Sequence, residues 1–310
     1  MVLSLVLNSV LIFFIYKHST VEFGTYRALM FILALFNIMY SITLALVMPV
    51  IHIYDLSFFL FTSGLGPVPK CASRLLTAVF ASLFAQSLYL IALQFVYRYI
   101  QVVRPSARFF FGKGRYILLA LYAFIAIDYG AICFFNFGPS LVKDAYLAKE
   151  MELSYGLDIN DIGYIGPVYT LNGEVQWFDV SGLLNVSIVI GSTLALIPYC
   201  GVATFRSLYR HGAISEITKK RQKQMFRLLL IQSFFSLAFT FIPSSAIIVL
   251  SLLRSKIGPN ANVLGISLAV YPVIEPLVVL YFVSSYHRAI RRYLGMVNHV
   301  RHHSSSLAKF

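Results

Sequence analysis

Charged residues are scarce in this chain, and that scarcity limits what it can be. Only 12% of its 310 residues are Asp, Glu, Lys or Arg, whereas 59% are hydrophobic, and the mean hydropathy is +0.78. A soluble domain would carry about twice that share of charge. The composition therefore excludes an ordinary soluble protein and predicts one that lies largely in a lipid bilayer.

Cysteine is also rare, with Cys71, Cys133 and Cys200 as the only three. None lies in residues 137–178, a long polar segment between two apolar stretches. A disulfide from the third apolar stretch to that segment is therefore excluded. A bridge between Cys71 and Cys133 stays conceivable, but we expect buried, unpaired thiols.

Residues for chemistry are missing too. No two histidines stand with a carboxylate or a cysteine at the spacing of metal ligands, and His302-His303 lies in a polar tail where we expect it to be solvated. Neither a glycine-rich phosphate loop nor a nucleophile elbow is present. The last apolar stretch contains no lysine, which excludes a retinal Schiff base there. We expect no enzyme, no metal and no cofactor.

Seven apolar stretches are what the chain does have. A bilayer core of about 30 Å needs roughly 20 helical residues, because no other open structure satisfies its backbone amides in lipid. The sequence therefore predicts an all-α membrane protein, a single seven-transmembrane helix bundle. We expect its helices at 1–16, 28–54, 75–97, 116–137, 180–205, 228–253 and 261–284. Two apolar stretches are longer than the helices predicted in them: the fourth covers 116–142 and the seventh covers 257–287.

The first of these is the weakest, since 16 residues reach only about 24 Å as a helix. It has neither the basic start nor the small-residue cleavage site of a signal peptide. We expect a short, uncleaved first helix, either of a complete chain or of one whose start lies upstream.

Basic residues are divided unevenly between alternate loops. If the N-terminus lies outside, the inner loops and tail contain 19 of the 25 Lys and Arg residues but only two of the 12 acidic residues. Positive residues gather on the cytoplasmic side of membrane proteins. Topology thus explains the net charge of +13, with the N-terminus outside and the C-terminus inside, and nothing supports a nucleic-acid partner.

The outer loops carry two predictions. Residues 55–70 contain an apolar run that is too short to span, so we expect a loop packed on the helix ends. Residues 164–177 hold Asn172-Gly173 between β-prone flanks, which favours a two-stranded hairpin because both residues tolerate positive φ. The alternative there is an irregular acidic loop.

Two further predictions concern the inner side of the membrane. Residues 214–227 are expected to form a basic extension of helix six, and residues 285–310 a cytoplasmic amphipathic helix followed by a disordered tail. The amphipathic pattern is carried by Tyr286, Ile290, Tyr293 and Leu294 at helical spacing. We expect this helix to lie on the inner leaflet.

Helix seven contains an acid between prolines, in the run Tyr271-Pro272-Val273-Ile274-Glu275-Pro276. Two prolines four residues apart free backbone carbonyls and make the segment deformable. An intramembrane carboxylate is costly and is by default a functional hypothesis. The alternative is a protonated Glu275 that is hydrogen-bonded to a neighbouring helix and only holds the structure together.

Two further features lie within the predicted helices. Helix three ends in Tyr97-Arg98-Tyr99, where an arginine between aromatic residues can pack against helices five and six and then release to meet a partner. The alternative is one more arginine placed by topology. Asp128 in helix four should point inward, and we favour a structural hydrogen bond over ligand contact. Pro198 and Pro243 are hinge candidates.

Together these motifs resemble those of the nematode Str-class chemoreceptors. The likeness covers nearly the whole chain, the short first helix excepted. It is carried by Tyr97-Arg98-Tyr99, by Tyr199-Cys200-Gly201, by the basic entry to helix six, by the helix-seven run, and by Ser285-Tyr286-His287-Arg288-Ala289-Ile290. In that family the helix-seven run looks like Tyr-Pro-x-x-Asp-Pro followed by Tyr-Arg-Lys-Ala-Ile, so Glu275 and His287 depart from it.

The resemblance implies a rhodopsin-type G-protein-coupled receptor, in the plasma membrane of a sensory neuron and its cilium. It would detect an odorant or a pheromone-like molecule and signal to a heterotrimeric G protein. By the same resemblance, Tyr97, Arg98 and Tyr99 hold the G-protein-coupling position. The helix-seven segment with Tyr271, Pro272, Glu275 and Pro276 holds the activation position.

A ligand cavity should then lie among the outer halves of helices three, five, six and seven. The candidate lining residues are Phe80, Phe84, Ser187, Ser244 and Tyr271. Such a lining suits small, largely uncharged volatiles, although aromatic residues in helices also serve plain packing. The rival function is a channel or transporter for a small solute, against which an odd number of spans with one large outer loop argues.

Overall fold

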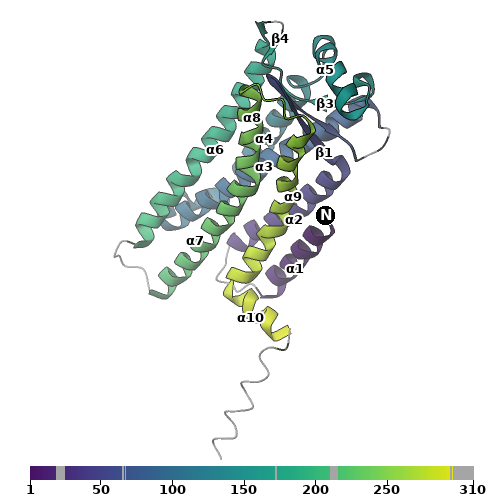
Figure 1. Cartoon of the computed structure of the whole chain (residues 1–310). Helices are drawn as coiled ribbons and strands as arrows, with labels where there is room; N and C mark the ends of the chain where they lie inside the picture. Colours follow the sequence, from purple (N-terminus) through teal and green to yellow (C-terminus); the bar gives the residue numbers. More distant parts are fainter. Residues whose placement is uncertain are drawn as a thin grey trace, which may run out of the picture.

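The computed structural model describes residues 1–18, 25–64, 66, 68–171, 173–209, 216–293 and 295. Over these residues, six helical segments are long and apolar enough to cross a membrane, and a shorter apolar helix precedes them (Figure 1). In chain order the seven are α1 (Val2–His18), α2 (Thr25–Val47), α3 (Lys70–Val102), α4 (Arg115–Phe135), α6 (Trp177–Tyr209), α7 (Glu216–Ser236) continued through η4 (Leu237–Phe241) into α8 (Ile242–Leu252), and α9 (Asn262–Phe282). The predicted helical membrane bundle is confirmed.

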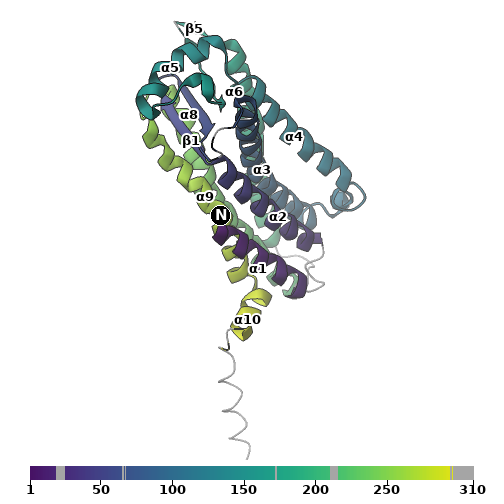
Figure 2. The same cartoon turned by 90° about the vertical axis from the view of Figure 1, so that its right-hand side faces the viewer.

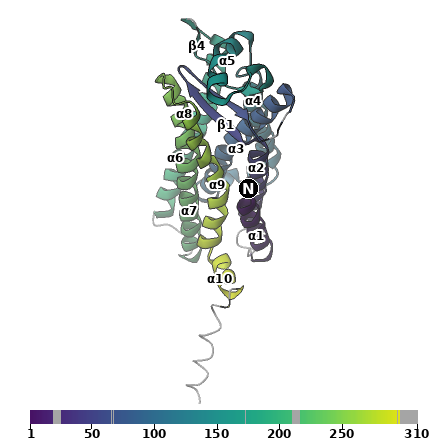
Figure 3. The ribbon, with the colours of Figure 1, turned by 45° about the vertical axis from the view of Figure 1, so that its right-hand side comes forward.

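The bundle carries different structures at its two ends. A small sheet and the helix α5 (Leu141–Tyr155) cover one end, and α10 (Ser284–Tyr293) lies at the other (Figures 1 and 3). We call these the outer and inner ends, following the orientation predicted from charge. Helix α1 runs beside α2 along only the inner half of the bundle (Figure 2).

Helix α3 forms the centre of the bundle, because it packs against α2, α4, α6 and α7. Its buried positions include the polar side chains Thr77, Ser82, Gln86 and Gln94. Polar groups in a membrane helix face the protein interior, where they find hydrogen-bond partners that lipid lacks. By contrast, α4 and α6 bury little of their surface and present it to the lipid.

The sixth span changes its helical geometry in the middle. Residues Leu237–Phe241 form a π-helical turn between α7 and α8, and Pro243 follows at the start of α8. Proline has no N–H group and its ring crowds the preceding turn, so an irregular turn is expected next to it. Two further spans contain proline, at Pro198 in α6 and at Pro272 and Pro276 in α9.

The outer end corrects two predictions. The stretch 28–54 is not one helix: α2 ends at Val47, and β1 (Pro49–Tyr54) follows after Met48 turns the chain at φ 42°. Residues expected to be a loop form β2 (Ser57–Thr62), which pairs antiparallel with β1 in the register Ile51↔Leu60. Proline cannot continue the helix, and the β-branched residues after it suit a strand.

The long outer segment supplies the rest of the outer end. Strand β3 (Tyr164–Ile165) extends the sheet beyond β2. The predicted hairpin is present as β4 (Thr170–Leu171) paired with β5 (Glu174–Val175), with Gly173 at φ 84° in its turn; Asn172 lies outside the described residues. The 3-10 turns η3 (Ile159–Asp161) and η5 (Pro259–Ala261) complete this end.

Helix α5 was not predicted, although its boundaries have local causes. Ser140 caps its start by accepting a hydrogen bond from the Lys143 amide at 3.3 Å, and Gly156 ends it in the left-handed conformation at φ 65°. Serine is a usual residue at the start of a helix, and glycine in the left-handed conformation is a usual residue at its end. Its apolar face, with Leu147 and Met151 buried, packs on the sheet.

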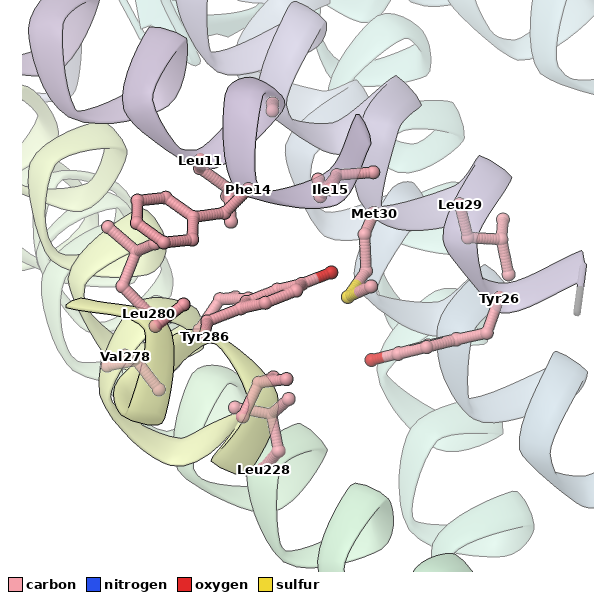
Figure 4. Close-up of a cluster of buried hydrophobic side chains, with 14 of the residues drawn as sticks. Leu11, Phe14, Ile15, Tyr26, Leu29, Met30, Leu228, Val278, Leu280 and Tyr286 are labelled. Carbon is pink, nitrogen blue, oxygen red and sulfur yellow. The ribbon is translucent and has the colours of Figure 1, made fainter. Parts of the chain in front are cut away.

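At the inner end, α10 is anchored in the bundle instead of only lying on the leaflet. Tyr286 is fully buried among residues of α1, α2, α7 and α9, including Phe14 at 6.1 Å between ring centroids (Figure 4). The 3-10 turn η2 (Pro105–Phe111) links α3 to α4 on this side. Helix α7 begins at Glu216, so the first residues of the predicted basic extension, and the predicted tail, lie outside the described residues.

Candidate functional site

A cavity of about 320 Å³ lies in the outer half of the bundle. Side chains of α3, α4, α6, α8 and α9 line it, together with residues of the three-stranded sheet. Four of the five predicted lining residues border this outer cavity, namely Phe80, Phe84, Ser187 and Ser244. The fifth, Tyr271, is buried in α9 but does not line it. The volume of the outer cavity is at the lower end of the range for small-molecule sites.

The sheet forms the roof of the outer cavity. Side chains alternate between the two faces of a strand, so Phe58 and Leu60 of β2 border the cavity, whereas Phe59 and Phe61 belong to the cluster that packs on α5. The chain therefore covers the cavity twice, first with the sheet and then with α5. Sequence reasoning missed these residues, because their position depends on strand pairing.

The lining is apolar and uncharged. None of the residues that border the outer cavity is Asp, Glu, Lys, Arg or His. Its polar atoms are the hydroxyls of Tyr129, Ser187, Ser244 and Ser245 and the thiol of Cys133. The Ser244 hydroxyl donates to the Phe241 carbonyl at 2.9 Å, which leaves its oxygen able to accept.

Helix α5 is held to the outer end by ion pairs. Lys143 lies 2.7 Å from Asp179 of α6, with both side chains buried, and its ammonium also donates to the carbonyls of Asn136 and Gly138. Asp144 lies 3.6 Å from Lys70 at the start of α3. Burial lowers the pKa of the Lys143 ammonium, and Asp179 opposes that change.

A histidine of the sheet contacts the same helix. His52 of β1 is fully buried, with Nε2 3.2 Å from Glu150 Oε1 and Nδ1 3.1 Å from the Tyr155 hydroxyl. Burial lowers the pKa of His52, although Glu150 raises it. All three cysteines of the chain are free, Cys71 being exposed while Cys133 and Cys200 are buried. Polar contacts and apolar packing, not a disulfide, therefore attach α5.

A second polar site lies deep in the bundle, between α1, α2 and α9. Pro276 has no N–H group, so the carbonyl of Pro272 has no partner in its own helix. Ser4 Oγ and Asn8 Nδ2 of α1 donate to this carbonyl at 3.1 Å and 3.0 Å. The proline spacing predicted a free carbonyl, and the structure supplies its partners from the first helix.

Glu275 belongs to the same site. Asn37 of α2 donates to the Glu275 carboxyl with its Nδ2 at 2.6 Å from Oε2, and to Asn8 Oδ1 at 3.4 Å. Glu275 is 4% exposed, and no Lys, Arg or His among the described residues lies at ion-pair distance from it. Tyr271, one helical turn earlier, is buried beside it. The arrangement fits a neutral carboxyl that joins α9 to α2.

At the inner end of α3, Arg98 is buried at 3% exposure. Its guanidinium lies 4.1 Å from the ring centroid of Tyr26 in α2, and Nη1 donates to Gln222 Oε1 of α7 at 3.1 Å. Nε and Nη2 have no hydrogen-bond partner among the described residues. Arg98 thus joins α2, α3 and α7, and sequence analysis identified neither Tyr26 nor Gln222.

The two tyrosines beside Arg98 point to different helices. The Tyr97 ring stacks on Tyr26 at 5.9 Å, and the Tyr99 ring lies 5.9 Å from that of Tyr199 in α6. The prediction for Asp128 is wrong: its side chain is half-buried in α4 and makes no hydrogen bond to any other described residue. The hydrogen bond expected of it is not made.

The chain is similar to known proteins over almost its whole length. The family described as "Serpentine type 7TM GPCR chemoreceptor Str" matches residues 1–291. The chain is 24% identical to serpentine receptor class r-10 of Caenorhabditis elegans over 277 residues, which cover 87% of this chain and 82% of the relative. It is 21% identical to G-protein coupled receptor str-33 of the same organism, over 93% of this chain and 86% of the relative.

Proposed function

Because the chain belongs to the serpentine 7TM GPCR chemoreceptor family Str, we propose that it couples the binding of an external small molecule to a heterotrimeric G protein. It is a multi-pass membrane protein of a receptor family. The ligand in this proposal is an odorant or a pheromone-like molecule, and the G protein is the cytoplasmic partner. The receptor then acts in the plasma membrane of a sensory neuron and its cilium, with the N-terminus outside.

The observation that carries the ligand class is the lining of the outer cavity. Phe80 and Phe84 supply aromatic surface, and Ser187 and Ser244 supply isolated hydroxyls. An ionised ligand would leave its charge unpaired there, at a cost of several kcal/mol. A small, largely uncharged molecule loses little on entry and gains the burial of its apolar surface.

The coupling step rests on Arg98 with Tyr97 and Tyr99. In the conformation described, Arg98 is held between Tyr26 and Gln222, which ties the inner end of α7 to α2 and α3. Outward movement of α7 would break the contact with Gln222 and free the guanidinium for a G protein. A ligand shifts this equilibrium only by the difference between its affinities for the two states.

The activation segment of the proposal is the part of α9 with Tyr271, Pro272, Glu275 and Pro276. Its prolines remove two helical hydrogen bonds. Ser4 and Asn8 of α1 donate to the Pro272 carbonyl that Pro276 leaves free, and Asn37 of α2 donates to the Glu275 side chain. Such a segment can change its bend without losing a full set of backbone bonds. It therefore offers a route by which the outer half of α9, which carries the cavity residue Leu268, affects the inner half.

The test is a signalling assay in cells that express this chain with a heterotrimeric G protein. A panel of volatile and pheromone-like compounds should produce a concentration-dependent response. Arg98→Ala should abolish that response while surface delivery persists. Gln222→Ala should instead raise the signal without ligand, because it removes a contact of the resting conformation.

The matched control is Arg206→Ala, since Arg206 is an exposed basic residue at the inner end of α6. It should leave signalling unchanged. An undiminished response in Arg98→Ala, at equal surface density, would contradict the coupling role. A ligand-evoked current that survives removal of the G protein would favour a channel instead.

A further inference from the structure

The roof closes the direct route from water into the outer cavity. Ile51 and Ile165, which line it from the sheet, are 0% and 3% exposed. Helix α5 lies over the other face of the sheet and is held there by the Lys143–Asp179 ion pair. A molecule arriving from the outer aqueous phase would have to displace both layers.

The flank of the cavity is open where the roof is closed. Leu183, Ser187, Gly191 and Leu194 recur at helical spacing along α6 and all border the cavity. Of these, Ser187 and Gly191 are also exposed on the surface of the chain. A Cβ atom placed on Gly191 would meet no atom within 4 Å, so open space lies directly beside it. Residues that are both lining and exposed mark a mouth.

This mouth lies at the depth of the bilayer. Ser187 and Gly191 are ten and 14 residues from the start of α6 at Trp177. At 1.5 Å a residue, they are about 15 Å and 21 Å below the outer end of a helix that is about 50 Å long. Their exposed neighbours Leu184 and Ile188 are apolar, as a lipid-facing surface requires. What lies outside the mouth is therefore acyl chain, not water.

The packing of α6 is consistent with an opening on this side. Helix α6 packs mainly against α3 and α4, whereas α8 packs against α9 and the strands β1 and β2. Across the mouth from α6, Ser244, Ser245 and Ile248 of α8 border the cavity, and all three are half-buried. The two helices thus share the cavity without closing it from the lipid.

We infer that the outer cavity is entered from the bilayer, between α6 and α8 past Ser187 and Gly191, and that its ligand is an uncharged molecule that partitions into the membrane. That the molecule acts as a ligand rests on the proposed function, whereas the route of entry does not. Concentration in the lipid then precedes binding. An ionised molecule is excluded twice, by the bilayer on the way and by the uncharged lining at the end.

Cys133 offers a direct reading of the route, because it lines the cavity and is 4% exposed. A chain with Cys71→Ser and Cys200→Ser keeps Cys133 as its only cysteine. In lipid nanodiscs this chain is treated with benzyl methanethiosulfonate, which is uncharged, or with the trimethylammonium-ethyl analogue, which is charged. A chain that keeps only the exposed Cys71 gives the reference rate for each reagent.

The uncharged reagent should modify Cys133, and the charged one should modify only Cys71. Adding Gly191→Phe should slow the modification of Cys133 by about tenfold or more, since a bulky side chain then occupies the mouth. Leu184→Phe and Ile188→Phe are matched controls, because both residues are exposed on α6 and neither lines the cavity. Both should leave the rate unchanged, and thermal unfolding checks that each variant is folded.

Three results would overturn the inference. They are modification of Cys133 by the charged reagent at the rate of Cys71, an unchanged rate in folded Gly191→Phe, and no modification of Cys133 by the uncharged reagent until the chain is unfolded. None of these readouts uses a G protein or a natural ligand. A receptor that stays silent in the signalling assay therefore contradicts the proposed function and leaves this result standing.

Discussion

Asn8 of the first helix donates a hydrogen bond to the carbonyl of Pro272 in the last, at 3.0 Å. The carbonyl is free only because Pro276, four residues later, has no N–H group to offer it. Asn8, 264 residues away in the sequence, thus supplies the hydrogen-bond donor that this turn of α9 lacks. This relationship explains why polar residues occur in a short and otherwise apolar first helix.

Replacing Asn8 should therefore destabilise the whole bundle. Asn8→Leu leaves the Pro272 carbonyl with one donor fewer in a buried site, at an expected cost of about 1–2 kcal/mol. The measurement is the unfolding temperature of the purified protein in detergent. Ser9→Ala is the control, because Ser9 is exposed on the same helix. Equal unfolding temperatures for the two variants would show that the contact contributes nothing.

Substitutions of Glu275 should distinguish a neutral carboxyl from a carboxylate. Glu275→Gln keeps an oxygen that accepts from Asn37 and adds no charge, so we expect stability close to that of the parent protein. Glu275→Leu removes the acceptor and leaves the buried Asn37 amide with only its longer bond to Asn8, at a cost of about 1–3 kcal/mol. Thermal unfolding of both variants measures the difference. A loss in Glu275→Gln as large as in Glu275→Leu would mean that the charge itself is needed.

Breaking the buried pair that holds α5 should loosen the outer end. Lys143→Met leaves Asp179 buried without its cation, a change that typically costs about 3–5 kcal/mol. We expect faster hydrogen exchange in α5 and in the sheet, with the inner half of the bundle unchanged. Lys149→Met is the matched control on the same helix, since Lys149 is exposed. Unchanged exchange in Lys143→Met would contradict the role given to this pair.

Acid should loosen the same region. Burial places the pKa of His52 below its ordinary value of 6.5, so the folded protein binds fewer protons there than the unfolded chain. The stability contributed by His52 is then complete above about pH 6.5 and falls as the pH is lowered through that value, levelling off below the folded pKa. The protection factors of the α5 amides at pH 7.5 and pH 5.5, each taken relative to the intrinsic exchange rate at that pH, measure the effect, and His52→Gln should remove the difference between them.

The sequence predicts the membrane part of this fold well, and the non-membrane part less well. Hydropathy identifies α3 over 75–97, yet the helix runs from Lys70 to Val102, because only the segment in lipid must be apolar. Hydropathy also cannot separate an apolar strand from an apolar helix, and for that reason the predicted helix 28–54 includes β1. Pro49 was the local signal against that reading.

The lining of the outer cavity also contains some residues that the sequence predicts and others that it does not. Phe80, Phe84, Ser187 and Ser244 border the outer cavity because the outer halves of their helices face one another, which topology alone predicts. Phe58 and Leu60 could not be predicted, since their position depends on the pairing of β2 with β1 and β3. Whether any of these residues binds a ligand stays a prediction.

The outer end has a further property that follows from how α5 is attached. With every cysteine free, the contacts of α5 are ionic and apolar and form without any oxidation step. Its attachment therefore responds to acidity through His52, whereas salt screens the buried Lys143–Asp179 pair little and reducing agents leave all of these contacts unchanged. The attachment of α5 to the outer end thus depends on the protonation of His52 and not on the oxidation of any cysteine.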